Sequence, residues 1–152
     1  MTSASKPRPS DRLTARANEL EREITRIVRG LAPALLALPG CGPLSAAKIV
    51  GEAAGAGRFK SKAAFARWNG TAPVPVWSGA TRFRLSRGGN RQINAALHRI
   101  AVTQCRGIGS GRAYVDTRLA AGDSQSEAMR MLRRRLSDEV FRRLLADENA
   151  TR

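Results

Sequence analysis

One long segment of this chain contains no acidic residue. Residues 53–115 include neither Asp nor Glu but carry eleven basic side chains: Arg58, Lys60, Lys62, Arg67, Arg82, Arg84, Arg87, Arg91, Arg99, Arg106 and Arg112. Such a segment cannot form a solvated face of mixed charge, and its surface repels itself unless a polyanion lies against it. It also offers no carboxylate to a metal ion. We therefore expect any metal used here to be brought by other parts of the chain or by another chain.

The overall composition predicts a mainly α fold. The chain has 152 residues and a formal net charge of +15, with 42% hydrophobic and only 5% aromatic residues. This length suits one compact domain with a tail or an appended helix. A core of Leu, Ile, Val and Ala, in a chain rich in Ala, Leu and Arg, favours helices.

The sequence also predicts the compartment. It has no run of apolar residues long enough for a membrane span, and residues 1–10 lack the apolar stretch of a signal peptide. Cys41 and Cys105 do not have metal-ligand spacing, so we expect two reduced cysteines. We therefore expect a cytoplasmic protein without a membrane partner, whose basic side chains bind nucleic acid.

The N-terminal part divides into a tail and a helix. Residues 1–10 are expected to be a disordered tail, residues 11–30 a coiled-coil-like helix, and residues 31–146 the main domain. The helix is predicted from apolar residues that alternate in steps of four and three: Leu13, Ala17, Leu20, Ile24 and Ile27. This seam is too short for a free-standing coiled coil. It is either the end of a longer one or a helix packed on the next domain.

Residues 35–50 predict two helices joined by a tight turn. The first helix should end before Pro39, and the second should begin near Pro43, because Pro suits the first turn of a helix. Gly40 and Gly42 permit positive φ and close approach. The segment resembles the helix-hairpin-helix motif of DNA repair and recombination proteins. That resemblance implies that the glycine turn and Lys48 face a DNA phosphate. The alternative is an ordinary turn between helices.

Further elements follow from capping and periodicity. We expect a short helix over residues 59–68 capped by Ser61, with Phe65 and Trp68 in the core. A small β-ribbon is possible over residues 74–83. Asn90 is expected to cap a helix whose buried stripe is Ile93, Ala96, Leu97, Ile100 and Ala101. A capping box at residues 124–127 opens a last helix with the apolar side Ala128, Met131, Leu132, Leu136, Val140 and Leu144.

The segment 78–91 contains the candidate functional residues. Ser78 lies in a Pro- and Gly-rich loop ahead of a basic run, where an arginine-held phosphodiester would be within reach of a hydroxyl. By pattern alone, an unreactive loop serine is the commoner situation. Phosphate contacts from the basic run, with Asn90 in the turn beside it, are the safer prediction: Arg82, Arg84, Arg87 and Arg91. The single histidine, His98, lies off the apolar stripe and is expected to face solvent.

Residues 31–145 resemble the C-terminal transposase domain of the bridge-RNA-guided insertion-sequence transposases. The resemblance rests on Leu-Pro-Gly-Cys-Gly-Pro-Leu-Ser-Ala-Ala at 38–47, Phe-Ala-Arg-Trp-Asn-Gly-Thr-Ala-Pro at 65–73, Ser78-Gly79, and Arg-Gly-Gly-Asn-Arg-Gln-Ile-Asn-Ala-Ala-Leu at 87–97. It implies that Ser78 attacks DNA and becomes covalently joined to it. It also implies that a bridge RNA selects the DNA, and that Mg²⁺ is held by acids of a separate N-terminal RNase-H-like domain.

The sequence departs from that family pattern at its start. Residues 1–10 show neither the strands nor the paired carboxylates of the acidic domain, so we expect that domain to be absent and this chain to bind no cofactor itself. The leading hypothesis is a DNA-binding serine domain that cuts and rejoins DNA only when an acidic half, or another protomer, completes the site. The alternatives are a non-catalytic DNA- or RNA-binding module, an inactive transposase fragment, and an RNA-binding protein of ribosomal type.

Overall fold

The described part of the chain is mainly helical, as expected. The structure is a computed structural model that describes residues 5–78, 80–84 and 88–152, with residues 77, 78 and 80–84 described by their backbone alone. Within these residues the elements are α1 (Pro9–Leu31), α2 (Pro33–Leu36), α3 (Pro43–Ala53), the 3-10 helix η1 (Ala56–Arg58), α4 (Lys62–Asn69), β1 (Val74–Ser78), β2 (Ala80–Arg84), α5 (Arg91–Cys105), α6 (Gly111–Ala120) and α7 (Gln125–Thr151).

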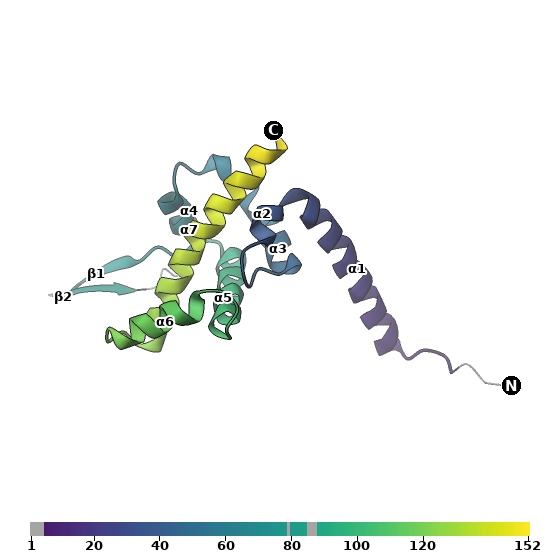
Figure 1. Cartoon of the computed structure of the whole chain (residues 1–152), viewed down its shortest axis with the longest axis horizontal. Coiled ribbons are helices and arrows are strands. Elements are labelled where there is room, and N and C mark those ends of the chain that lie inside the picture. Colours follow the sequence, from purple (N-terminus) through teal and green to yellow (C-terminus); the bar gives the residue numbers. More distant parts are fainter. Residues whose placement is uncertain (1–4, 79, 85–87) are drawn as a thin grey trace.

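The long helix α7 runs through the helical body (Figure 1) and contacts α2, η1, α4, α5 and α6. It begins with the predicted capping box, in which the Ser124 hydroxyl accepts from the Glu127 amide while the Glu127 carboxylate accepts from the Ser124 amide. Five of its predicted core residues are buried: Ala128, Leu132, Leu136, Val140 and Leu144. The assignment of Met131 was wrong, because its side chain is 36% exposed, while Phe141 takes part in the core.

Helix α5 forms the second layer of the core, between α3 and α7. All five residues of its predicted stripe are buried: Ile93, Ala96, Leu97, Ile100 and Ala101. The predicted N-cap is confirmed, since Asn90 Oδ1 accepts from the Ile93 amide at 3.0 Å. The next helix is α6, which the sequence had not predicted as a separate element.

Helix α4 and the segment before it form a small aromatic cluster. Ser61 caps α4, as expected, by accepting from the Ala64 amide at 3.2 Å. Phe65 is buried, and Phe59 and Trp68 pack beside it with ring centroids 4.9–5.9 Å apart. The Arg58 guanidinium covers Phe59 and Trp68 at 4.4 and 4.8 Å from their centroids. Trp68 is therefore a packing residue.

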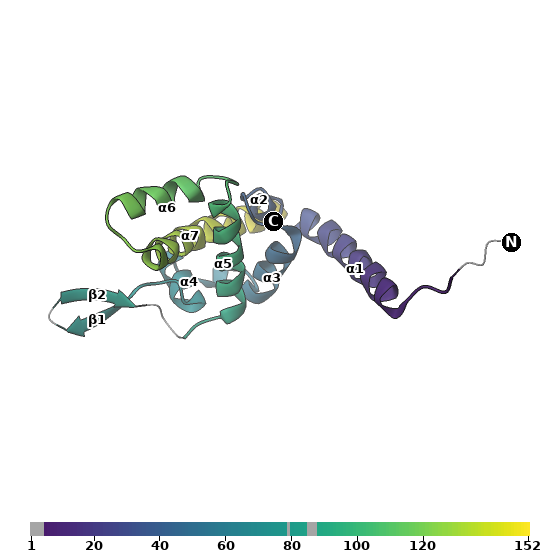
Figure 2. The same cartoon turned by 90° about the horizontal axis from the view of Figure 1, so that it is seen from below.

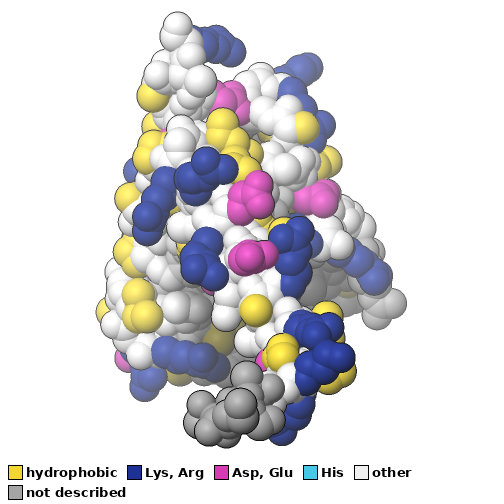
Figure 3. All heavy atoms as spheres, turned by 90° about the vertical axis from the view of Figure 1, so that its right-hand side faces the viewer, with side chains coloured by type: hydrophobic (Ala, Val, Ile, Leu, Met, Phe, Trp, Pro, Cys, Tyr) yellow, Lys and Arg dark blue, Asp and Glu magenta, His cyan; other side chains and the backbone are white. Residues whose placement is uncertain are grey.

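Helix α1 extends away from the body (Figures 1 and 2), and most of its predicted apolar seam is uncovered. The helix is confirmed, although it begins at Pro9. Leu13, Leu20 and Ile27 are 73%, 44% and 48% exposed, whereas Ile24 and Val28 pack onto the core. Lys and Arg mix with Asp and Glu on the face seen from this end (Figure 3), in contrast to the acid-free segment.

Strands β1 and β2 form the predicted ribbon, which extends from the opposite end of the body (Figures 1 and 2). They pair antiparallel, with Val74 opposite Arg84 and Ser78 opposite Ala80. The base of the ribbon is closed by glycine packing. A Cβ on Gly70, whose φ is +78°, would lie 2.7 Å from the Gly88 carbonyl oxygen, and the Asn90 amide donates to the Trp68 carbonyl at 2.8 Å.

The last turns of α7 hold the N-terminal half of the domain through carboxylates. Asp147 is buried, and its two oxygens accept from the Ala34 and Leu35 amides at 2.8 and 3.1 Å. Glu148 accepts from the Ala56 and Gly57 amides at the start of η1. None of the described helices combines the length and apolar character needed to cross a membrane.

The Asp147 contact predicts a large effect of a single substitution. Asp147→Ala removes the acceptor of two amides, each worth roughly 1–3 kcal/mol when left unpaired, so we expect a loss of about 2–4 kcal/mol in unfolding free energy. Urea unfolding followed by circular dichroism measures it. The control, Asp116→Ala, removes an exposed pair with Arg112 and should cost less than about 0.5 kcal/mol. Equal losses in the two variants would contradict this account of α7.

Candidate nucleic-acid interface

The turn between α2 and α3 has the predicted placement. Helix α2 ends at Leu36, ahead of Pro39, and α3 begins at Pro43. The turn is closed by two backbone hydrogen bonds, from Leu38 to Leu35 and from Cys41 to Leu38. Leu38 and Cys41 are buried and anchor it to the core. Burial raises the pKa of the Cys41 thiol to about 11, so this thiol stays protonated at neutral pH.

The two glycines of this turn have different roles. Gly40 has φ +84°, and a Cβ on it would lie 3.1 Å from the Ile100 carbonyl oxygen and 3.3 Å from Gln104 Cγ, so its close approach is to α5. Gly42 has φ −76°, and a Cβ added there would meet no other part of the chain within 4 Å. The expectation of positive φ is confirmed for Gly40 and wrong for Gly42. Gly42 faces open space, where a ligand could approach.

The first turn of α3 exposes backbone donors. No side chain caps this helix, and among the described residues nothing accepts from the Leu44 or Ser45 amides. Such amides, at the positive end of the helix dipole, suit an anion. Gly42 precedes them as the N-cap residue. The turn therefore presents uncovered donors beside a glycine that leaves them accessible.

Lys48 and Arg91 lie on neighbouring helices, by the start of α5, whereas the turn packs on the C-terminal half of α5. Lys48 Nζ donates to Gln92 Oε1 at 2.9 Å, which links α3 to the start of α5. Arg91 is exposed and has no ion pair among the described side chains. Asn90 uses both ends of its amide inside the protein, because Nδ2 donates to Glu52 Oε2 at 2.8 Å while Oδ1 caps α5. Asn90 thus positions the start of α5.

The ribbon carries the other predicted residues. Ser78 is the last residue of β1 and pairs with Ala80, while Arg82 and Arg84 pair with Val76 and Val74. Their side chains, and the whole of Arg87, lie outside the described structure. The ribbon and the α2–α3 turn occupy different parts of the molecule (Figures 1 and 2), so the predicted residues do not converge on one pocket.

Acids and bases are used differently in the described structure. Every acid after α1 has a partner within the protein: Glu52 binds Asn90, Asp116 binds Arg112, Asp123 binds Arg118, Glu127 caps α7, Asp138 binds Arg134, Glu139 binds Arg142 and Arg143, and Asp147 and Glu148 accept from amides. Of the bases in residues 53–115 whose side chains are described, Arg112 alone forms an ion pair.

No group of three His, Cys, Asp or Glu within the described residues could hold a metal ion.

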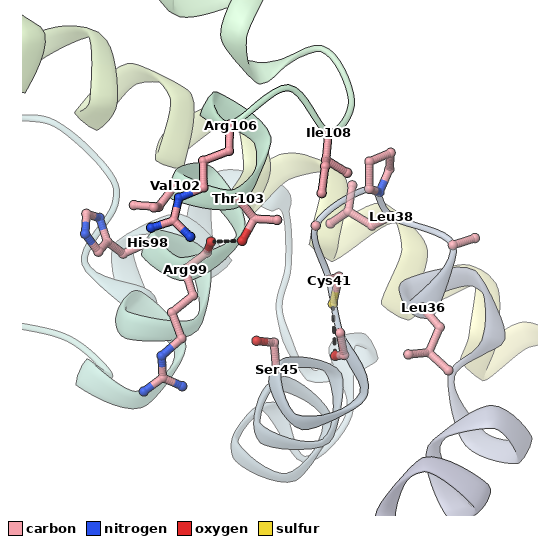
Figure 4. Close-up of a pocket in the computed structure, with 14 residues that line it drawn as sticks. Leu36, Leu38, Cys41, Ser45, His98, Arg99, Val102, Thr103, Arg106 and Ile108 are labelled. Atoms are coloured by element: carbon pink, nitrogen blue, oxygen red, sulfur yellow. Dashed lines mark hydrogen bonds between the residues drawn. The ribbon is translucent and has the colours of Figure 1, made fainter. Parts of the chain in front are cut away.

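A groove beside the α2–α3 turn was not predicted. It has a volume of about 900 Å³ and separates the turn from the outer face of α5 (Figure 4). Arg99, Arg106 and the exposed His98 line it from α5 and its C-terminal end. Sequence reasoning included both arginines in the basic total and gave them no role. The groove depends on how α5 packs against α3, which no local pattern reveals.

Comparison with known proteins identifies relatives. The family model described as "Transposase IS116/IS110/IS902 family" matches residues 32–116, which include the turn, the ribbon and α5. The insertion element IS110 uncharacterized 43.6 kDa protein of Streptomyces coelicolor is 30% identical over 123 residues, covering 78% of this chain and 30% of that protein. A probable family 20 transposase of Pseudomonas aeruginosa is 31% identical over 142 residues, covering 91% and 39%. The chain thus spans about a third of the length of these relatives.

The contrast between the glycines predicts opposite sensitivities. Gly40→Ala places a Cβ against α5 at positive φ, so we expect a loss of roughly 1–3 kcal/mol in unfolding free energy. Gly42→Ala meets open space and should change it by less than about 0.5 kcal/mol. Urea unfolding of both variants measures the difference. A loss in Gly42→Ala as large as that in Gly40→Ala would show that the turn is packed differently.

Proposed function

This chain belongs to the IS116/IS110/IS902 family of transposases, and we propose that it is the DNA-binding, serine-bearing part of such an enzyme. In this proposal Ser78 cuts and rejoins DNA once an acidic, metal-binding domain completes the site. The observation that carries the proposal is the position of Ser78. It forms the last pair of a ribbon that extends from the body, within a segment that has many arginines and no acid.

The ribbon register supports cooperation between the serine and the arginines. Directly paired positions of an antiparallel ladder lie on the same face, and so do positions two apart on one strand. Arg82 pairs with Val76, and Val76 is two positions before Ser78. Arg84 pairs with Val74 in the same way. Positions 78, 82 and 84 therefore share one face of the ribbon, the face on which we propose that the DNA backbone lies.

The chemistry proposed for this face is transesterification. The Ser78 oxygen forms a bond to phosphorus, the bond from phosphorus to one deoxyribose oxygen breaks, and that oxygen leaves as a hydroxyl. Reversal with a new strand end rejoins the DNA. Guanidinium groups are suited to hold the phosphate and to stabilise the charge that develops on it. The serine proton needs an acceptor.

The acceptor and the metal-binding acids are proposed to belong to another domain or chain. All eight acids after α1 already have partners in the described structure; seven lie on helices, Asp123 lies in the loop between α6 and α7, and none lies on the ribbon. The uncovered seam of α1 offers a surface through which another protomer or an acidic RNase-H-like half could be held. A bridge RNA as guide is part of the same proposal, on the strength of the family resemblance alone.

DNA would be positioned by the α2–α3 turn. We infer a phosphate contact at the uncovered Leu44 and Ser45 amides, with Gly42 allowing close approach. Lys48 and Arg91, by the start of α5, are proposed to contact phosphates farther along the DNA. This geometry supports interpretation as a helix-hairpin-helix motif. The unpaired cations of residues 53–115 equally favour a second candidate function, a non-catalytic nucleic-acid-binding module that uses the same surface.

Loss of the serine should abolish covalent chemistry. With labelled duplex DNA, Mg²⁺ and the acidic domain of a full-length family member, we expect a protein–DNA adduct that survives denaturing electrophoresis. Ser78→Ala should give no adduct. The matched control is Ser110→Ala, which removes an exposed hydroxyl outside the ribbon and should leave the adduct unchanged. An adduct that persists in Ser78→Ala would contradict the catalytic proposal and leave the binding-module function.

Binding to duplex DNA should depend on salt and on Gly42. The logarithm of the association constant should fall with the logarithm of salt concentration by about 0.9 per phosphate neutralised. Gly42→Leu should weaken binding roughly tenfold without lowering stability, which corresponds to one charge-assisted contact of about 1.5 kcal/mol. The control is Gly51→Leu, which also meets open space but lies farther along α3. Fluorescence anisotropy measures the salt dependence and the affinity of each variant. Binding that ignores salt would contradict the polyanion argument.

A further inference from the structure

The groove between the α2–α3 turn and α5 has two chemically different walls. Leu38, Pro39 and Ile108 line the side formed by the turn and by the loop after α5 (Figure 4). Ile108 is 52% exposed, so a branched apolar side chain stands in solvent at the mouth of the groove. Val102, half-buried on α5, lies on the opposite wall, beside His98 and Arg106 (Figure 4). An occupant that covered Pro39 and Ile108 would gain hydrophobic contact.

The other wall is cationic. His98, Arg99 and Arg106 project from α5 and its C-terminal end, and none of the residues that line the groove is acidic. Both arginines are exposed, and among the described residues their side chains have no ion pair or hydrogen bond. Across the groove stands Ser45, in the first turn of α3. A cleft lined by one sign of charge concentrates the opposite charge.

We propose that this groove binds an unpaired stretch of nucleic-acid strand, with its bases against the exposed Pro39 and Ile108 and its phosphates on Arg99 and Arg106. Unpaired strands offer apolar base faces and phosphates together. A duplex stacks its base faces inside and would leave the apolar wall uncovered. Guanidinium forks match phosphate oxygens in pairs.

This inference rests on the proposed function for its choice of nucleic acid but adds a site on the α5 side of the turn, which the groove borders at Gly42 and Ser45. The turn amides and the ribbon are assigned to duplex DNA and to the scissile phosphate. The groove is assigned to single-stranded DNA or RNA, such as a strand that is displaced or unpaired near the cut. It therefore gives a role to Arg99, Arg106 and Ile108, which the ribbon chemistry does not use.

The test compares charge-matched variants of the full chain by fluorescence anisotropy. The probes are short labelled oligo(dT), oligo(rU) and a duplex of mixed sequence. Arg99→Gln/Arg106→Gln should weaken oligo(dT) binding by about tenfold or more and reduce its log–log salt slope by about 1.4, at roughly 0.7 per single-strand phosphate. The control, Arg12→Gln/Arg26→Gln, removes the same charge from exposed positions of α1 and should change affinity by less than about threefold.

A second pair of variants tests the apolar wall. Ile108→Ser should weaken oligo(dT) binding several-fold and leave duplex binding unchanged, whereas Leu119→Ser, at an exposed leucine of α6, should affect neither. Thermal unfolding should be the same for all variants, because the replaced side chains are exposed. Comparison of oligo(dT) with oligo(rU) tells which strand the groove prefers.

Two outcomes would overturn the groove proposal. One is an equal loss of oligo(dT) affinity in the two arginine double variants, which would show that Arg99 and Arg106 act only through long-range electrostatics. The other is unchanged oligo(dT) binding in Ile108→Ser. Either result is distinguishable from failure of the proposed function, because the adduct is measured on duplex DNA and depends on Ser78, which lies on the ribbon and does not line the groove. Weakened oligo(dT) binding with normal adduct formation supports a groove separate from the serine.

Discussion

The domain depends on a buried carboxylate near the end of its longest helix. Asp147 accepts from two amides at the start of α2, and Glu148 accepts from two at the start of η1. Arg143, one turn earlier, donates to the Ala34 carbonyl at 2.8 Å. The end of α7 thus fixes α2, the first element of the α2–α3 turn. Since a buried carboxylate is stable only when its oxygens are paired, these bonds also restrict how α2 can move.

The same carboxylates explain why the surface remains so basic. The acids that follow α1 are occupied as caps, as amide acceptors or as partners of arginines on α6 and α7. None remains for the cations of residues 53–115 except Asp116, which pairs with Arg112. These acids are therefore used within the described fold, while most of the described cations of residues 53–115 are left without an acidic partner. A nucleic acid would supply the counter-charge that the chain does not.

Local sequence patterns correctly predicted the features that depend on neighbouring residues. The α5 stripe, the Asn90 and Ser124 caps and the start of α3 at Pro43 depend on residues close in sequence, and all were found. Contacts between distant segments were missed. Gly40 and Gly42 look alike in sequence and differ only because α5 lies against one of them. Met131 was misassigned because helical spacing predicts which side of the helix is buried but not how wide the buried side is. Asp147 is 113 residues from Ala34, and the groove likewise forms only when α3 and α5 meet.

The geometry places the proposed functions at separate positions along the molecule. The ribbon with Ser78 extends from one end, α1 extends from the other, and the α2–α3 turn with its groove lies on the body between them (Figures 1 and 2). Under the proposed function, DNA bound at the turn is fixed relative to the ribbon because Gly70 and Asn90 hold the ribbon base against α4 and α5. The acids that complete the site must then reach the far end of the ribbon from outside the described domain. A partner held on the exposed seam of α1 would have to span the body to do so, because α1 and the ribbon extend from opposite ends of it.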